Sequence, residues 1–255
     1  MGITTPHLRF SSSMEQIGVM EQTSSRNQTQ RPSRSARVRN RTARPGIGDV
    51  RLRMGALGLS PLGVQAVATV DAVGPEVVGF APGDRVAMRE PGSRAGFQRV
   101  VSERELIGIP KDVSFDAAAA MLPSGLVART ILRQIHAIGR GNRVYITPDD
   151  SGSHLFVAAW ASHLGATVVG ESERQVADVV VTTADYRAAE RWRYGPGLAQ
   201  LAASDVFQAM RDGAFDTLEI ARHPLADAAR VHSDVTSRRT TGPVVLMPGV
   251  GELAA

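Results

Sequence analysis

Residues 144–170, VYITPDDSGSHLFVAAWASHLGATVVG, decide the class of fold. Val144–Ile146 and Thr167–Gly170 are short apolar runs typical of buried strands, and the apolar spacing of Leu155–Leu164 predicts a helix between them. Val179–Thr182 repeats the strand pattern farther along the chain. Because strands that alternate with helices predict a parallel sheet, this part of the chain is expected to be α/β.

The residues that precede this unit predict a β-rich part. Val50, Leu52 and Met54 alternate with arginines, as in a half-buried strand, and Val64–Val73 predicts a second strand. Further short strands follow, separated by glycine and proline turns, which is typical of a compact β domain. Two helices are expected after Ser114, over Ala117–Leu122 and Gly125–Ile138, and further helices over Ser204–Asp212 and Leu225–Ser237 lead to a closing strand, Val244–Met247.

Three parts of the chain follow from these patterns. Residues 1–47 are expected to form a short strand and a polar, arginine-rich lead-in, residues 48–122 and 240–255 the β-rich domain, and residues 123–239 the α/β domain. Nine arginines lie between Arg26 and Arg53, but no aromatic or base-reading motif accompanies them, so we favour a solvated lead-in over an arm for nucleic acid.

Composition excludes several classes of function. The chain has no cysteine, so it has neither disulfides nor a cysteine-rich zinc site, and no His or carboxylate spacing predicts another metal site. No run approaches the ~20 apolar residues of a membrane-spanning helix. The N-terminal residues lack a secretory signal pattern, so we expect a cytoplasmic protein with no membrane or nucleic-acid partner.

Five stretches in order resemble the zinc-free quinone oxidoreductase and polyketide enoyl reductase branch of the medium-chain dehydrogenase/reductase superfamily. They are DVRLRMGALGLSP (49–61), GVQAVATVDAVGPEVVGFAPGDRVA (63–87), AGFQRVVSERELIGIPKDVSFDAAAAMLPSGL (95–126), AAWASHLGATVVG (158–170) and HPLADAARVHSDVTSRRTTGPVVLMP (223–248). The resemblance implies a GroES-like β-rich catalytic domain, a truncated Rossmann-like parallel-sheet domain and an active cleft between them.

The departures from the family pattern concern the site that holds NADPH in such enzymes. A loop is missing after Ser60-Pro61, and Val127 stands where the family has a threonine beside the nicotinamide. The family's AAGGVG turn is replaced by DDSGSH (149–154), in which only Gly152 remains and two carboxylates stand where a pyrophosphate would bind. The strands that would carry the nicotinamide half of the sheet are also missing after residue 187.

We therefore expect no cofactor, or NADPH if the family activity persists. Gly152, Ser172, Arg174 and Tyr186 match positions that family members use for the cofactor, the last three near the adenosine 2′-phosphate, and binding there would be a remnant.

The candidate catalytic residues are Asp149, Asp150 and His154. His154 follows Asp150 by four residues, so the two side chains could pair on one face of a helix and move protons near neutral pH. The alternative, which we favour, is that Asp150 or Ser151 caps the helix and His154 is solvated. The candidate residues of the substrate cleft are Ser60, Arg89, Glu90, Ser124, Val127 and Ser151.

Three hypotheses about function stay open. The first is a repurposed, cofactor-independent enzyme that acts on a small apolar, polyketide-like molecule by isomerisation, dehydration, cyclisation or cycloaddition. The second is an NADPH-dependent quinone or enoyl reductase with an atypical cofactor site. The third is a non-catalytic ligand-binding or partner protein, and a homodimer is possible under each. We also expect Arg191–Ala203, or a second chain, to cover the sheet edge exposed by the missing strands.

Overall fold

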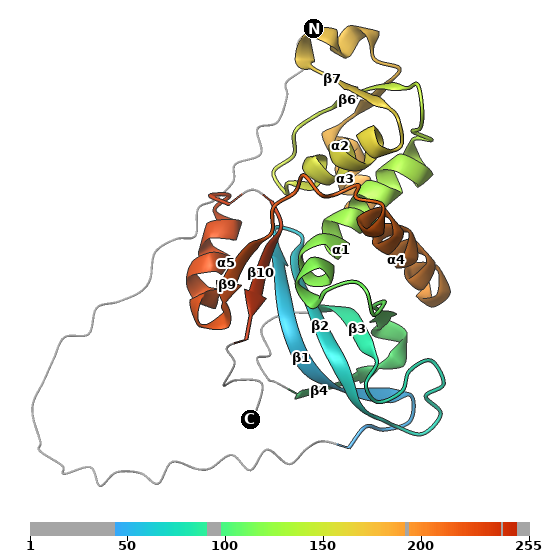
Figure 1. Ribbon diagram of the computed structural model, residues 1–255, viewed down its shortest axis with the longest axis vertical. Coiled ribbons are helices and arrows are strands. Elements are labelled where there is room, and N and C mark those ends of the chain that lie inside the picture. The colour runs from blue at the N-terminus through green and yellow to red at the C-terminus, as the bar shows by residue number, and fades with distance from the viewer. Residues whose placement is uncertain (1–43, 91–97, 192–193, 241, 249–255) are drawn as a thin grey trace, which may run out of the picture. The chain divides into compact units, whose positions relative to one another are not determined.

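The structure is a computed structural model that describes residues 44–90, 98–191, 194–240 and 242–248 (Figure 1). All of them belong to one compact unit. Most of the lead-in expected over residues 1–47 lies outside the described residues, as does the strand expected within it.

The larger sheet is built around the long antiparallel pair β1 (Asp49–Ser60) and β2 (Gly63–Val73). The turn between them is tight, since Ser60 is directly opposite Gly63. The order of the sheet is β5-β3-β2-β1-β10-β9, with β4 also paired to β1. The other strands are β3 (Arg85–Glu90), β4 (Gln98–Ser102), β5 (Ile107–Gly108), β9 (Ala221–Pro224) and β10 (Val244–Met247), and only the β9–β10 pair is parallel.

The smaller sheet is parallel, as the sequence predicts. Its order is β7 (Thr167–Val169), β6 (Arg143–Ile146) and β8 (Val179–Val181). From β6 the chain passes through α2 (Ser153–His163) to β7 on one side, then through the 3₁₀ helix η3 (Glu171–Val176) to β8 on the other side. The direction of winding therefore reverses at β6, and in open α/β sheets ligands bind outside the carboxyl ends of the strands at such a switch point.

One helix, α1 (Phe115–Thr130), replaces the two expected around Pro123, and it continues into a π-helical turn, η2 (Ile131–Ile135). Ser114 begins it by accepting the backbone N–H of Ala117 at 3.2 Å. Pro123 has no N–H for the carbonyl of Ala119, and β1 approaches that carbonyl so closely that a Cβ on Gly58 would lie 1.8 Å from its oxygen. The glycine therefore lets β1 lie against the helix at the carbonyl that Pro123 leaves without its usual backbone donor.

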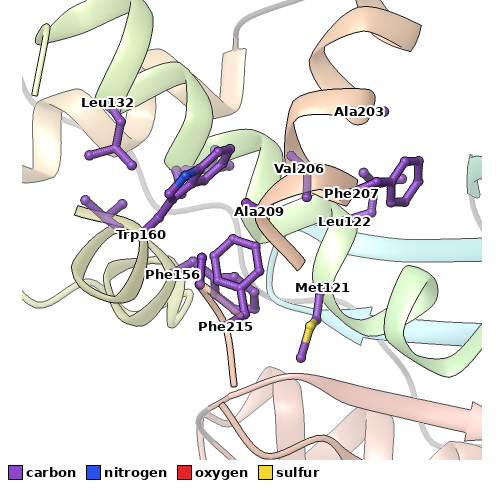
Figure 2. Packing of buried hydrophobic residues seen from close by; sticks show 14 of the residues in the cluster. Met121, Leu122, Leu132, Phe156, Trp160, Ala203, Val206, Phe207, Ala209 and Phe215 are labelled. Carbon is purple, nitrogen blue, oxygen red and sulfur yellow. The ribbon is translucent and has the colours of Figure 1, made fainter. Parts of the chain in front are cut away.

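The core is continuous from the large sheet, through α1, to the α/β part. It includes Ala56 and Val67 of the sheet together with Phe156, Trp160 and Phe215. Figure 2 shows the last three side by side, with the ring centroid of Phe215 5.3 Å from that of Phe156 and 5.6 Å from that of Trp160. The segment 115–135 is apolar enough to cross a membrane, but 67% of its apolar window is buried inside the protein, so core packing explains its composition.

The remaining helices are α3 (Thr183–Arg191), α4 (Pro196–Arg211), the short η4 (Leu225–Asp227) and α5 (Ala228–Thr236). The helix α4 packs against α1 and β5. A Cβ on Gly125 would lie 2.5 Å from a methyl carbon of Val206, so the glycine permits this approach. The boundary expected at 122/123 falls inside α1, and β9 and α5, expected in the α/β part, lie against β10 and β1 of the larger sheet.

Candidate functional site

The turn between β6 and α2, residues 147–152, lies at the carboxyl end of the central strand of the parallel sheet. Gly152 has a φ of 76°, which lets the chain turn into α2. The carboxylate of Asp149 accepts the backbone N–H of Ser151 at 3.0 Å, the backbone N–H of His154 at 2.7 Å and the hydroxyl of Ser151. The expectation that Asp150 caps the helix is wrong, because Asp149 accepts the N–H of His154. The hydroxyl of Ser151 accepts the N–H of Ser153 at 3.3 Å, so Ser151 contributes to the cap as expected.

Asp149 also pairs with His154, whose Nδ1 lies 2.9 Å from the carboxylate. The Asp149 side chain is 7% exposed and that of His154 24%. Burial acts to raise the pKa of Asp149, but its hydrogen bonds with His154 and Ser151 outweigh it and hold the pKa below the ordinary value. Asp149 is therefore ionised at neutral pH, and His154 is oriented rather than freely solvated.

The predicted pairing of Asp150 with His154 is wrong. The helix begins at Ser153, so residue 150 precedes it and the four-residue spacing does not place both side chains on one helical face. The side chain of Asp150 is 70% exposed and forms an ion pair with Arg238 at 2.9 Å.

Across the switch point, polar groups follow β8. Asp185 accepts the N–H of Thr182 at 2.7 Å and lies 3.4 Å from the imidazole of His136. Tyr186 is 2% exposed, and its hydroxyl has no hydrogen-bond partner among the described residues. Burial, and then the carboxylates of Asp149 and Asp185, raise the pKa of Tyr186.

A separate pocket of about 200 Å³ lies between the start of β2, β5, α1 and the end of α3. We call it the Tyr194 pocket. Its lining is Leu62, Gly63, Val64, Gln65, Glu105, Ile107, Pro123, Leu126, Val127, Thr130, Ala189, Glu190 and Tyr194. Most of the lining is apolar, with a few polar groups, as is usual for small-molecule sites.

Of the expected cleft residues, the structure places Val127 in this pocket. Ser60 lies in the β1–β2 turn, where its hydroxyl donates to the carbonyl of Gly63 at 3.3 Å, and Ser124 is buried inside α1. Ser151 belongs to the β6–α2 turn. The side chains of Arg89 and Glu90 lie outside the described part of the chain.

Asp149, Asp150 and His154 do not line the Tyr194 pocket. The structure therefore separates the candidate catalytic residues from Val127, and their catalytic role stays a prediction. Sequence analysis missed Tyr194 and Thr130, because only the packing of α1 against the segment before α4 brings them together.

No protein-family model matches the chain, but individual proteins do. It is 27% identical to a quinone oxidoreductase of Pseudomonas aeruginosa, over 84% of this chain and 91% of the relative. That alignment spans 297 positions against the 255 residues of the chain, so the relative contains internal segments that this chain lacks. A 2-haloacrylate reductase of a Burkholderia species is 35% identical over 49% of this chain and 45% of its own length.

Among solved structures, a quinone oxidoreductase of Escherichia coli complexed with NADPH superposes with a TM-score of 0.63 at 18% identity, over 81% of this chain and 93% of that one. At this identity the likeness shows the fold, which agrees with the expected pairing of a β-rich domain and a parallel-sheet domain.

Groups of this chain occupy two places that the family resemblance links to the phosphates of such a nucleotide. At the β6–α2 turn, the N–H groups of Ser151 and His154 are bound by the ionised Asp149. Arg174, one of the cofactor positions, lies 3.6 Å from the carboxylate of Glu171 and over the ring of Tyr145 at 5.1 Å. A carboxylate of this chain therefore lies at each of these two places.

Proposed function

Because the chain belongs to the medium-chain dehydrogenase/reductase superfamily, we propose that it binds and converts a small carbonyl compound in the Tyr194 pocket, without holding NADPH at the β6–α2 turn. The position of Asp149 is the observation that supports the absence of NADPH from the β6–α2 turn. Its carboxylate occupies the helix N-terminus where an anionic group would otherwise bind.

The energetic argument has two parts. A phosphate about 4 Å from an ionised carboxylate is repelled by about 1 kcal/mol per pair of charges in water, and by several times more in a partly buried turn. Displacing Asp149 instead breaks its hydrogen bonds with the N–H groups of Ser151 and His154, which costs about 2 kcal/mol or more. Both routes weaken NADPH binding at this turn.

The kind of ligand follows from the relatives and from the pocket. Quinones, 2-haloacrylates and enoyl groups, after which relatives are named, all have a carbon–carbon double bond conjugated to a carbonyl. A dry cavity of about 150 Å³ can bind benzene, so a pocket of about 200 Å³ suits one ring or a short chain. Isomerisation, dehydration and cyclisation of such a molecule need the transfer of protons and not of hydride. Side chains can supply proton transfer without a nucleotide cofactor.

NADPH titration tests the proposal. Purified protein is titrated with NADPH while nucleotide fluorescence is followed, and mass spectrometry checks for nucleotide that co-purifies. We expect neither saturable binding nor bound nucleotide. The double variant with Asp149→Gly and Asp150→Gly is expected to gain measurable affinity, since it frees the N–H groups of α2 and removes two charges.

Saturable binding of NADPH to the unmodified protein would overturn the proposal and favour a second candidate, an NADPH-dependent reductase with an atypical cofactor site. The names of the relatives favour this candidate. Consumption of NADPH with 1,4-benzoquinone or 2-cyclohexen-1-one, followed by absorbance, would establish it.

A further inference from the structure

Within the Tyr194 pocket, we infer that Tyr194 holds the carbonyl oxygen of a neutral ligand, and that Thr130 and Arg129 position its hydroxyl. This inference rests on the proposed function, because it names the group of the ligand and the residue that recognises it. It concerns side chains on α1 and directly before α4, away from the β6–α2 turn.

The hydroxyls of Tyr194 and Thr130 form a close pair. Their oxygens lie 2.6 Å apart, and the hydroxyl of Thr130 also donates to the carbonyl of Leu126 at 2.8 Å. Both side chains line the pocket beside Leu126 and Val127. A polar pair therefore lies against a mostly apolar wall, which is the arrangement that orients a small ligand.

The proton of Thr130 can occupy two positions. When it points to Leu126, Tyr194 donates its proton to Thr130. When it turns to the oxygen of Tyr194, the phenolic proton can point to a ligand oxygen, while the carbonyl of Leu126 keeps the backbone N–H from the next helical turn. A carbonyl ligand can thus accept a hydrogen bond from Tyr194 while the hydroxyls of Tyr194 and Thr130 stay hydrogen-bonded to each other.

Arg129, which lies over the aromatic ring of Tyr194, supports this arrangement. It forms an ion pair with Asp205 of α4 at 2.7 Å, donates to the hydroxyl of Tyr194 at 3.4 Å and lies 5.7 Å from the centre of that ring. Burial acts to lower the pKa of Arg129, but the hydrogen bonds to Asp205 and Tyr194 outweigh it and raise the pKa. A cation that donates to the phenol oxygen strengthens the phenol as a donor.

The charges of the pocket favour a neutral ligand over a carboxylate. Glu105 and Glu190 line it together with Tyr194. The positive charge of Arg129, which donates to Tyr194, is balanced by Asp205. An anionic ligand would be repelled by Glu105, whereas a ketone or aldehyde would not.

Ligand-observed NMR titrations test the inference with three probes: 2-cyclohexen-1-one, cyclohexene, which lacks the oxygen, and 1-cyclohexene-1-carboxylate, which is anionic. We expect Tyr194→Phe to bind 2-cyclohexen-1-one about tenfold more weakly than the unmodified protein, the effect of one buried hydrogen bond. Thr130→Val is expected to bind it about threefold more weakly. Cyclohexene should bind both variants as it binds the unmodified protein, and the carboxylate should bind worst.

The matched control is Tyr145→Phe, which removes a hydroxyl that bonds Glu171, outside the pocket. It should leave all three affinities unchanged. Because the chain has three tyrosines, labelling each ring carbon that bears the hydroxyl with ¹³C gives a direct readout. The signal that Tyr194→Phe removes should shift when 2-cyclohexen-1-one is added.

The outcomes separate the inference from the proposed function. If Tyr194→Phe, folded by circular dichroism, binds the enone as tightly as the unmodified protein, Tyr194 is not the recognising residue although the pocket still binds ligand. Preferential binding of the carboxylate would overturn the assignment of a neutral ligand. If the unmodified protein binds neither the enone nor cyclohexene, the proposed function fails and the inference fails with it.

Discussion

Replacing Asp149 by asparagine should lower the free energy of unfolding by about 2 kcal/mol at neutral pH. The two oxygens of Asp149 accept the N–H of Ser151 at 3.0 Å and that of His154 at 2.7 Å, and one of them also faces the imidazole of His154. Asparagine has one oxygen, so one N–H loses its acceptor and the amide group faces another donor. A buried hydrogen bond to a charged group contributes about 1.5–3 kcal/mol.

Thermal and urea denaturation, followed by circular dichroism, measure the effect. For a chain of this size, a loss of about 2 kcal/mol lowers Tm by about 4–8 °C. Asp150→Asn is the matched control, because Asp150 is 70% exposed and its ion pair with Arg238 should contribute less than about 1 kcal/mol. Equal stability of the two variants would refute the role assigned to Asp149.

The dependence on pH gives the same prediction a second test. The pKa of Asp149 is lower in the folded protein than its ordinary value of about 3.9. Its contribution is therefore fully present above that value and is lost as the pH falls through the lower, folded pKa. The stability difference between the unmodified protein and Asp149→Asn should narrow as the pH falls below about 4. A difference that grows as the pH falls from about 4 to 2 would contradict this.

Three further substitutions test the fold and the site. Gly58→Ala should cost more than about 3 kcal/mol, because its Cβ would lie 1.8 Å from the carbonyl oxygen of Ala119; soluble yield and circular dichroism measure the loss. Phe215→Ala should cost about 3–5 kcal/mol by leaving a cavity beside Trp160, measured from the urea midpoint and tryptophan emission. Val127→Thr should cost about 1 kcal/mol and should not create NADPH binding, checked by thermal melting and nucleotide fluorescence.

Two further substitutions serve as controls, one for Gly58→Ala and one for Phe215→Ala. Gly170→Ala places a Cβ where no atom lies within 4 Å, and Leu198→Ala truncates a side chain that is 62% exposed. Each should change the free energy of unfolding by less than about 0.5 kcal/mol. If Gly58→Ala behaves like Gly170→Ala, the packing described for β1 on α1 is wrong. If Phe215→Ala behaves like Leu198→Ala, the packing described for Phe215 against Trp160 is wrong.

Local sequence patterns predicted the short apolar strands correctly, because a run of apolar, β-branched residues favours a strand by itself. The closing strand, Val244–Met247, occurs with the expected bounds, and the strand over Val144–Ile146 extends by one residue to Arg143. The sequence pattern failed at Pro123, where two helices were expected and one continuous helix is present. That helix packs on β1, α2 and α4, which are far from it in the chain and leave no local signal in its sequence.

Prediction of the candidate site from the sequence was limited even more by contacts between residues far apart in the chain. The sequence showed that the β6–α2 turn is unusual, but not which aspartate caps the helix, because that depends on where α2 begins. The pairing of β8 directly with β6 is a property of the sheet and not of either strand alone. Tyr194 carries no local signal of its own and gains its environment from Thr130 and Arg129 on α1. The segment expected to cover the sheet edge includes the start of α4, a helix that packs on α1 and β5, and the covering of that edge stays a prediction.

The sharing of α1 between the two sheets has a thermodynamic consequence. Residues of this one helix pack on β1, on α2 and on α4 within a single continuous core. Neither half can unfold without exposing the apolar side chains of α1, so partial unfolding would forfeit stabilisation from both sides at once. The described unit should therefore melt in one cooperative transition, with calorimetric and van't Hoff enthalpies that agree, despite having two sheets of different architecture.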